Sequence, residues 1–132
     1  MREIKFRAWD KTHKILANVL EIDFYIGKVA LDDGEAVWAL GLKNVVLEQY
    51  TGLKDKNGKE IYEGSLVKYT EDGDSFISEV KYFGNDDYPA FDIEAPSAFY
   101  FESNVLSSGV ANNCLEVVGN IHENPELLEV SE

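Results

Sequence analysis

Residues 47–69 constrain the fold more than any other part of this 132-residue chain. They contain its only Asn-Gly pair, Asn57-Gly58. Such a pair between strand-like segments is the strongest short-range hairpin signal, because both central residues of a type I′ turn need positive φ. Gly64 follows, just before the apolar pair Leu66-Val67, where a new strand is expected to begin. The sequence therefore predicts a central hairpin whose two-residue turn has both Asn57 and Gly58 at positive φ.

Strand-like patterns recur on both sides of this hairpin. Residues 2–9 alternate apolar and polar side chains, as a half-buried strand does. Residues 36–42 fit either a strand or a helical turn. From Ser65 onward, turn residues separate short strand-like runs about every 8–12 residues, as in small barrels and sandwiches. Residues 107–113 are expected to form a loop, and residues 124–128 a short helix that begins at an Asn-Pro pair.

The charge is divided unevenly along the chain. Residues 1–68 carry 11 Lys or Arg and 11 Asp or Glu, whereas residues 69–132 carry 1 and 14, so the formal charge of −13 lies entirely in the second part. Nucleic-acid backbones and anionic membranes both attract Lys and Arg, so neither is an expected partner. The expected partner is an unidentified protein, for which a basic surface is one option. No oligomeric state follows from the sequence.

The expected location of the chain is the cytoplasm. Its first residues alternate charge and carry no signal-peptide pattern, and no apolar run reaches the roughly 18 residues of a transmembrane helix. Cys114 is the only cysteine, so no intramolecular disulfide points to an oxidising compartment.

Three patterns that resemble sites of chemistry are better explained as turns or core. Residues 52–60 resemble a phosphate-binding loop, but the glycines are one residue too far apart and a Glu replaces the magnesium-binding Ser or Thr. Residues 72–79 lack the alternating carboxylates of a calcium loop. Cys114 and His122 would lie about 26 Å apart on one extended segment, and His13 is a turn residue with no ligand partner nearby. We therefore expect no catalytic residue, no cofactor and no metal site.

Three segments together resemble the YopX family, whose members are encoded by phages and prophages of mainly low-GC Gram-positive bacteria. They are REIKFRAWD at residues 2–10, QYTGLKDKNGKEIYEG at 49–64 and GNIHENPELL at 119–128. They lie at the start, middle and end, so the resemblance spans the chain. Ser65 departs from the family pattern, which usually has Asp at this position. The resemblance implies a β-rich fold with an SH3-like barrel in the second half, and it implies no reaction.

We predict a mainly β protein with a β-rich N-terminal subdomain at residues 1–53. Residues 54–132 are expected to form an SH3-like small barrel with a short C-terminal helix. The predicted function is that of a non-enzymatic protein-interaction module with an acidic C-terminal face. Acids expected on this face are Glu71, Asp72, Asp74, Glu79, Asp86, Asp87, Asp92 and Glu94. Residues expected to bind the partner are Asp72, Asp74, Asp86, Asp87, Tyr88 and Tyr100.

Two alternatives stand beside this hypothesis. A small enzyme could assemble a carboxylate site from residues far apart in sequence, and a buried acid with a raised pKa would favour it. A narrower form of the interaction hypothesis is an acidic surface that mimics DNA and inhibits a basic host protein. The aromatic residues of 76–101 fit either a core or a peptide groove, and an exposed aromatic patch rimmed by acids would favour the groove.

Overall fold

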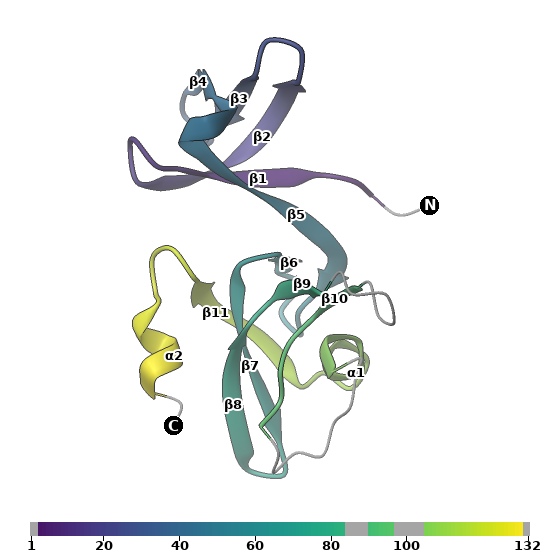
Figure 1. Ribbon diagram of the computed structural model, residues 1–132. Helices are drawn as coiled ribbons and strands as arrows, with labels where there is room; N and C mark the ends of the chain where they lie inside the picture. The colour runs from purple at the N-terminus through teal and green to yellow at the C-terminus, as the bar shows by residue number, and fades with distance from the viewer. Residues whose placement is uncertain (1–2, 84–89, 97–104, 131–132) are drawn as a thin grey trace. The chain divides into compact units, whose positions relative to one another are not determined.

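The computed structural model describes residues 3–83, 90–96 and 105–130 of the chain. The chain divides into two compact units, Met1–Tyr50 and Thr51–Glu132. The subdomain boundary predicted from the sequence lies slightly later, after residue 53. In Figure 1 the first unit runs from purple to blue and the second from teal to yellow. Strand β5 (Val45–Lys54) contributes residues to both units.

An antiparallel sheet forms the first unit, with its strands in the order β4-β3-β2-β1-β5 (Figure 1). Residues 36–42, which fit either a strand or a helical turn, form a strand and the start of a single 3₁₀ turn. The elements are β1 (Phe6–Asp10), β2 (Ile15–Asp23), β3 (Lys28–Asp32), β4 (Val37–Gly41) and η1 (Leu42–Asn44). The buried core of this unit consists of Ala8, Ala17, Val29, Leu31 and Val45.

The second unit contains a three-stranded sheet in the order β11-β7-β8 and a two-stranded ribbon of β9 and β10. The end of β5 also pairs with the short strand β6. The strands of the second unit after β5 are β6 (Glu60–Tyr62), β7 (Ser65–Glu71), β8 (Asp74–Glu79), β9 (Lys81–Phe83), β10 (Ala90–Asp92) and β11 (Leu115–Asn120). Its helices are α1 (Val105–Ala111) and α2 (Glu126–Val130).

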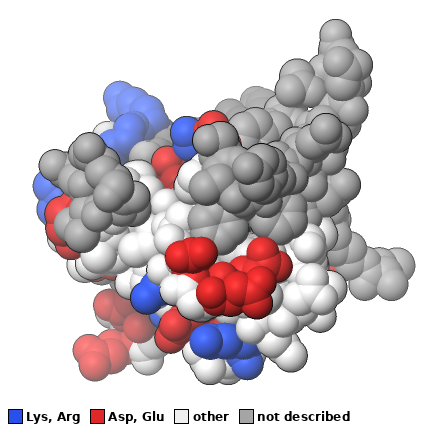
Figure 2. All heavy atoms as spheres, turned by 90° about the horizontal axis from the view of Figure 1, so that it is seen from below, with Lys and Arg blue, Asp and Glu red and all other residues white. Residues whose placement is uncertain are grey.

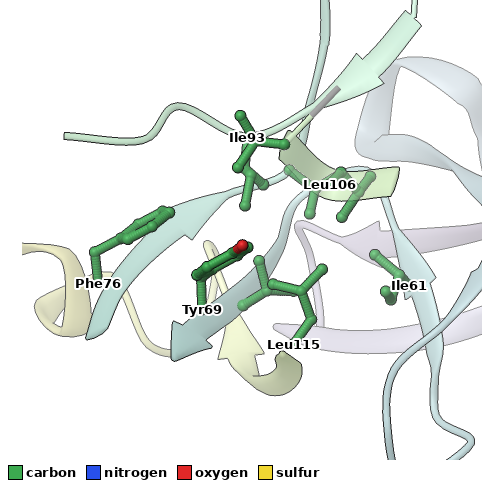
Figure 3. Packing of buried hydrophobic residues seen from close by; sticks show 9 residues of the cluster. Ile61, Tyr69, Phe76, Ile93, Leu106 and Leu115 are labelled. Carbon is green, nitrogen blue, oxygen red and sulfur yellow. The ribbon is translucent and has the colours of Figure 1, made fainter. Parts of the chain in front are cut away.

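The core of the second unit is built around two aromatic rings. Tyr69 from β7 and Phe76 from β8 stack with their centroids 5.2 Å apart. Figure 3 shows Leu115 beside Tyr69, with Leu106 of α1 and Ile93 above them in this view. All five side chains are at least 95 % buried, so this cluster is expected to supply much of the hydrophobic stabilisation of the unit.

The mainly β fold and the short C-terminal helix are confirmed. The SH3-like detail is not confirmed, because the sheets formed by the described strands are not closed into a barrel.

The loop predicted for residues 107–113 is wrong over most of its length, because α1 occupies Val105–Ala111. Ser and Gly are poor helix formers, but tertiary packing favours the helix here. A Cβ on Gly109 would lie 2.7 Å from Leu115 Cγ, so glycine allows α1 to approach β11 closely.

The central hairpin is present, but its predicted turn type is wrong. Gly58 has a φ of 80°, whereas Asn57 is not among the residues with positive φ. The N–H of Gly58 donates to the carbonyl of Asp55 at 3.0 Å, and the N–H of Asp55 donates to the carbonyl of Lys59 at 2.8 Å. The loop therefore has three residues, the common arrangement in which a turn is followed by one left-handed glycine.

We expect Gly58→Val to lower the free energy of unfolding by about 1–2 kcal/mol, because a β-branched residue adopts positive φ only with strain. No atom lies within 4 Å of the position of an added Cβ, so the loss should come from the backbone alone. Gly58→Asn is the matched control and should lose clearly less, since Asn tolerates the left-handed region. Urea denaturation measures both, and equal losses would contradict the backbone explanation.

Candidate functional site

The turn between β7 and β8 presents carboxylates on a short loop. Glu71 pairs with Asp74 in the strand ladder, so only Asp72 and Gly73 connect the strands. Asp72 has a φ of 52° and Gly73 one of 86°, the signs that a type I′ turn requires. The two-residue turn expected at Asn57-Gly58 is therefore found here.

Three exposed acids, Glu71, Asp72 and Asp74, define what we call the acidic turn. Within the described parts of the chain, none of the three forms an ion pair with Lys or Arg. The second unit carries 5 Lys and 17 Asp or Glu, so its formal charge is 5 − 17 = −12. Figure 2 views the second unit from the side at which its β7–β8 turn lies, and acidic side chains cluster near the middle of this view.

Another acid expected on the surface is buried instead. Asp92 is 3 % exposed, and its Oδ1 accepts the N–H groups of Ile93 at 2.9 Å and Leu106 at 2.8 Å. The prediction that Asp92 contributes to the acidic face is wrong, because its carboxylate joins β10 to the first turn of α1. Glu94 is exposed, with its carboxylate 3.9 Å from the ammonium of Lys81. The predicted binding residues Asp86, Asp87, Tyr88 and Tyr100 lie outside the described residues.

The aromatic residues of 76–101 divide between core and surface. Phe76 is 5 % exposed and belongs to the core. Tyr82 is 51 % exposed. Its ring and the ring of Phe91 form a T-shaped contact, with the ring centroids 5.2 Å apart. Phe91 itself packs against the core. Tyr82 is therefore the exposed member of the three aromatic side chains that the structure describes in this stretch.

The most exposed apolar side chains lie in the first unit, which the sequence reasoning missed as a surface feature. Phe24, Tyr25 and Ile26 form the β2–β3 turn and are 77 %, 96 % and 62 % exposed. Oδ1 of Asp23 accepts the N–H groups of Tyr25 and Ile26, which fixes the turn. In the sequence, the signal for this exposed apolar turn was the run of three large apolar residues directly before Gly27.

Asp55 is a buried carboxylate that organises the central hairpin. Its Oδ1 accepts the N–H groups of Asn57 at 2.8 Å and Lys59 at 2.9 Å, and its Oδ2 accepts the N–H of Val117 on β11 at 2.8 Å. Burial alone would raise the pKa of Asp55, but the N–H donors of Val117, Lys59 and Asn57 outweigh it and lower the pKa. Asp55 therefore remains ionised and ties the hairpin to a strand far away in sequence.

Asp10 has the corresponding role in the first unit. It is fully buried, and its Oδ1 accepts the backbone N–H groups of Thr12 and His13. Its Oδ2 lies 2.6 Å from His13 Nδ1 and accepts the indole N–H of Trp38 at 2.9 Å. Burial would raise the pKa of Asp10, but the His13, Trp38 and Thr12 donors together lower it. His13 lies in the turn after β1, as predicted, and its imidazole has the carboxylate of Asp10 as a partner.

The third motif also forms a turn fixed by side chains. Oδ1 of Asn120 accepts the N–H groups of His122 at 3.0 Å and Glu123 at 2.9 Å. Asn124 Oδ1 accepts the N–H of Asn120 at 3.2 Å, and a Cβ on Gly119 would lie only 2.4 Å from that oxygen. Gly119 is therefore required for the close approach of Asn124 to the strand.

Ser65, at the position where the resemblance to the YopX family implies an Asp, is fully buried. Its hydroxyl oxygen accepts the N–H of Tyr62 at 3.0 Å, which closes the turn at Gly64. The serine hydroxyl oxygen thus accepts a backbone hydrogen bond that an Asp carboxylate oxygen could also accept.

Cys114 and His122 lie on either side of β11, at opposite ends of the strand. Cys114 packs against the core, and its thiol lies 3.5 Å from the carbonyl of Asn112. The described residues include no group of three or more His, Cys, Asp or Glu placed to hold a metal ion. None of the helices in the described residues is long and apolar enough to cross a membrane.

The sequence profile of the YopX family, described as "YopX protein", matches residues 5–129. The chain belongs to the YopX family. Two solved structures resemble this YopX-family chain, and each comparison covers 97 % of it and 99 % of the other protein. Protein EF1440 from Enterococcus faecalis is 29 % identical with a TM-score of 0.66. Protein yopX from Bacillus subtilis is 23 % identical with a TM-score of 0.60, which shows a shared fold. No curated protein matches the chain.

The motifs that resemble the YopX family have a common structural role. Each contains a side-chain oxygen that accepts backbone N–H groups of its own turn: Asp10, Asp55 and Asn120. The middle and last motifs are also joined to each other, because the N–H of Ile121 donates to the carbonyl of Gly64 at 2.9 Å. These motif residues therefore stabilise the fold of this YopX-family chain.

Proposed function

We propose that this YopX-family protein is a non-enzymatic interaction module that binds a basic protein partner through the acidic turn, in the cytoplasm of a bacterium that carries the phage or prophage. The observation that carries the proposal is the display of three exposed carboxylates on a two-residue turn. A short turn loses little conformational freedom on binding, and a unit of charge −12 attracts a basic surface over a distance.

The buried carboxylates support the non-enzymatic part of this proposal. A carboxyl group that acts as a general acid at neutral pH needs a raised pKa. The pKa values of Asp10 and Asp55 are lowered by the N–H donors around them, despite burial. Their oxygens are occupied by turn hydrogen bonds, as expected of groups that stabilise structure.

The binding proposal is tested by removing charge without changing shape. The variant Glu71→Gln/Asp72→Asn/Asp74→Asn keeps side-chain size, and Asn tolerates the positive φ at position 72. The control variant Glu3→Gln/Glu21→Gln/Glu126→Gln removes the same charge from exposed positions outside the turn. Each protein is immobilised and used to capture partners from a nuclease-treated lysate of the bacterium that carries the gene.

We expect the wild type and the control variant to capture the same basic protein, and the acidic-turn variant to capture much less of it. Once that protein is purified, its association rate with the wild type should fall as salt increases, because screening weakens attraction between exposed charges. The acidic-turn variant should associate at least about tenfold more slowly, with a smaller salt dependence. Equal association rates for the acidic-turn and control variants would contradict the proposal.

A further inference from the structure

Strand β4 is the outermost strand of the sheet in the first unit. Its sequence is VWALG, which contains no charged residue and no proline. Edge strands usually carry Lys, Pro or a bulge that prevents pairing with another chain. Its pairing with β3 is regular from Val37 to Gly41, and no bulge interrupts it. This edge therefore has the properties of a strand that pairs with another strand.

Two hydrogen bonds at the ends of the β3–β4 hairpin establish which backbone groups point outward. The N–H of Asp33 donates to the carbonyl of Ala36 at 3.3 Å, and the N–H of Leu42 donates to the carbonyl of Gly27 at 2.8 Å. Hydrogen-bonded pairs alternate with non-hydrogen-bonded pairs along an antiparallel ladder. Between these two bonds, the residues of β4 that bond to β3 are therefore Trp38 and Leu40.

The remaining residues of β4 direct their N–H and carbonyl groups away from β3. These are Val37, Ala39 and Gly41, and no described strand lies on that side. Val37 is 64 % exposed and Ala39 is also exposed, whereas Trp38 and Leu40 pack against the core. Small side chains at positions 39 and 41 leave room for another backbone to approach.

Charges of opposite sign lie at the two ends of this edge. Asp32, Asp33 and Glu35 lie at the end where β4 begins. At the other end of the edge, Lys28 on β3 lies opposite Gly41 in the ladder, and Lys43 lies in η1, directly after β4. Two further charges lie at the Lys43 end. The Nζ of Lys11 donates to the carbonyl of Lys43, and Asp23 stands opposite Lys28 and offsets part of the positive charge.

We propose that β4 is a homodimer interface, in which it pairs antiparallel with β4 of a second copy of this chain. A two-fold axis midway between Ala39 of one copy and Ala39 of the other aligns Val37 with Gly41 of the second copy, so that the outward backbone groups meet in hydrogen-bonded pairs. In this arrangement the end of the edge that carries Glu35 lies beside the end of the second copy that carries Lys43, and the symmetry repeats this juxtaposition. A self-complementary surface of this kind is what a two-fold interface requires. Charge complementarity thus selects a second copy rather than an arbitrary peptide.

The first test measures the oligomeric state of the full chain by sedimentation velocity from about 1 to 200 µM. Because strand pairing buries a small surface, we expect a monomer–dimer equilibrium with a dissociation constant on the order of micromolar. Val37→Lys should weaken the dimer at least about tenfold, whereas the matched control Val37→Thr should leave it nearly unchanged. A wild-type protein that remains monomeric throughout the range overturns the proposal.

A charge exchange tests the register. Glu35 and Lys43 are both exposed, so substitutions there should not disturb folding. Glu35→Lys and Lys43→Glu should each weaken the homodimer at least about tenfold, because like charges then face each other twice. The double variant should recover the dimer, and mixing the two single variants should give a heterodimer with both contacts restored. Dimers that are unaffected by the single substitutions would show that another surface associates, and would overturn the proposal.

This inference is independent of the proposed function. The variant Glu71→Gln/Asp72→Asn/Asp74→Asn changes residues of the second unit and should leave the dimer dissociation constant unchanged. Hydrogen exchange provides a direct readout, since the amides of Val37 and Ala39 should become protected as protein concentration rises. Concentration-dependent protection confined to other strands would contradict pairing through β4.

Discussion

Replacing Arg7 with alanine should lower the free energy of unfolding by about 3–5 kcal/mol, because it removes the guanidinium that contacts the buried carboxylate of Glu48. Arg7 on β1 and Glu48 on β5 are directly opposite in the ladder, and Arg7 Nε donates to Glu48 Oε1 at 2.8 Å. Their side chains are only 13 % and 4 % exposed. The charge on Glu48 is therefore stabilised by Arg7 in an environment that contains little water.

The matched control replaces both partners at once. In the variant Arg7→Met/Glu48→Leu, neither position carries a charge, and the free energy of unfolding should return to within about 1 kcal/mol of wild type. Arg7→Lys should lie between the two, since Lys keeps the charge but not the planar donor geometry. Urea denaturation followed by circular dichroism measures all three. An equal loss in the single and double variants would attribute the effect to packing of the Arg7 side chain.

The sequence predicted the strands because their signals are local. Alternation at residues 2–9 and the turn residues after Ser65 depend on neighbours in the chain. The type of the central turn did not follow from local signals. The Asn57-Gly58 pair favours a type I′ turn, but the carboxylate of Asp55 accepts the N–H groups of Asn57 and Lys59 and favours a three-residue loop.

The features that the sequence analysis missed depend on contacts between distant residues. Asp92 is buried because it accepts the N–H of Leu106, which lies 14 residues away. The carboxylate of Asp10 accepts the indole N–H of Trp38, which lies 28 residues away. Single-sequence patterns treat an Asp in a turn as solvated, so they cannot distinguish a carboxylate that satisfies buried N–H groups. The exposure of Asp72 and Asp74 was easier to predict, because Asp72-Gly73-Asp74 is a local turn signal.

The same contacts explain why Asp55 should be among the least replaceable residues of the second unit. It is 7 % exposed, and its two oxygens accept three backbone N–H groups. One donor belongs to Val117 on β11, and the N–H of Lys56 also donates to the carbonyl of Leu115 at 3.1 Å. Loss of this carboxylate therefore affects the hairpin and its attachment to β11 together.

We expect Asp55→Ala to lower the free energy of unfolding by at least about 3 kcal/mol, since three N–H donors lose a charged acceptor. Asp55→Asn keeps one acceptor oxygen and should lose less, whereas Asp74→Ala removes an exposed acid and should stay within about 0.5 kcal/mol of wild type.

The difference in stability between wild type and Asp55→Asn should also depend on pH. Because folding lowers the pKa of Asp55, its ionisation adds stability above the unfolded pKa of about 3.9 and loses it as pH falls through the lower folded value. Urea midpoints measured from neutral pH down to about pH 3 should therefore converge for the two proteins, and a gap that widens on acidification would contradict a charged Asp55 in the folded state.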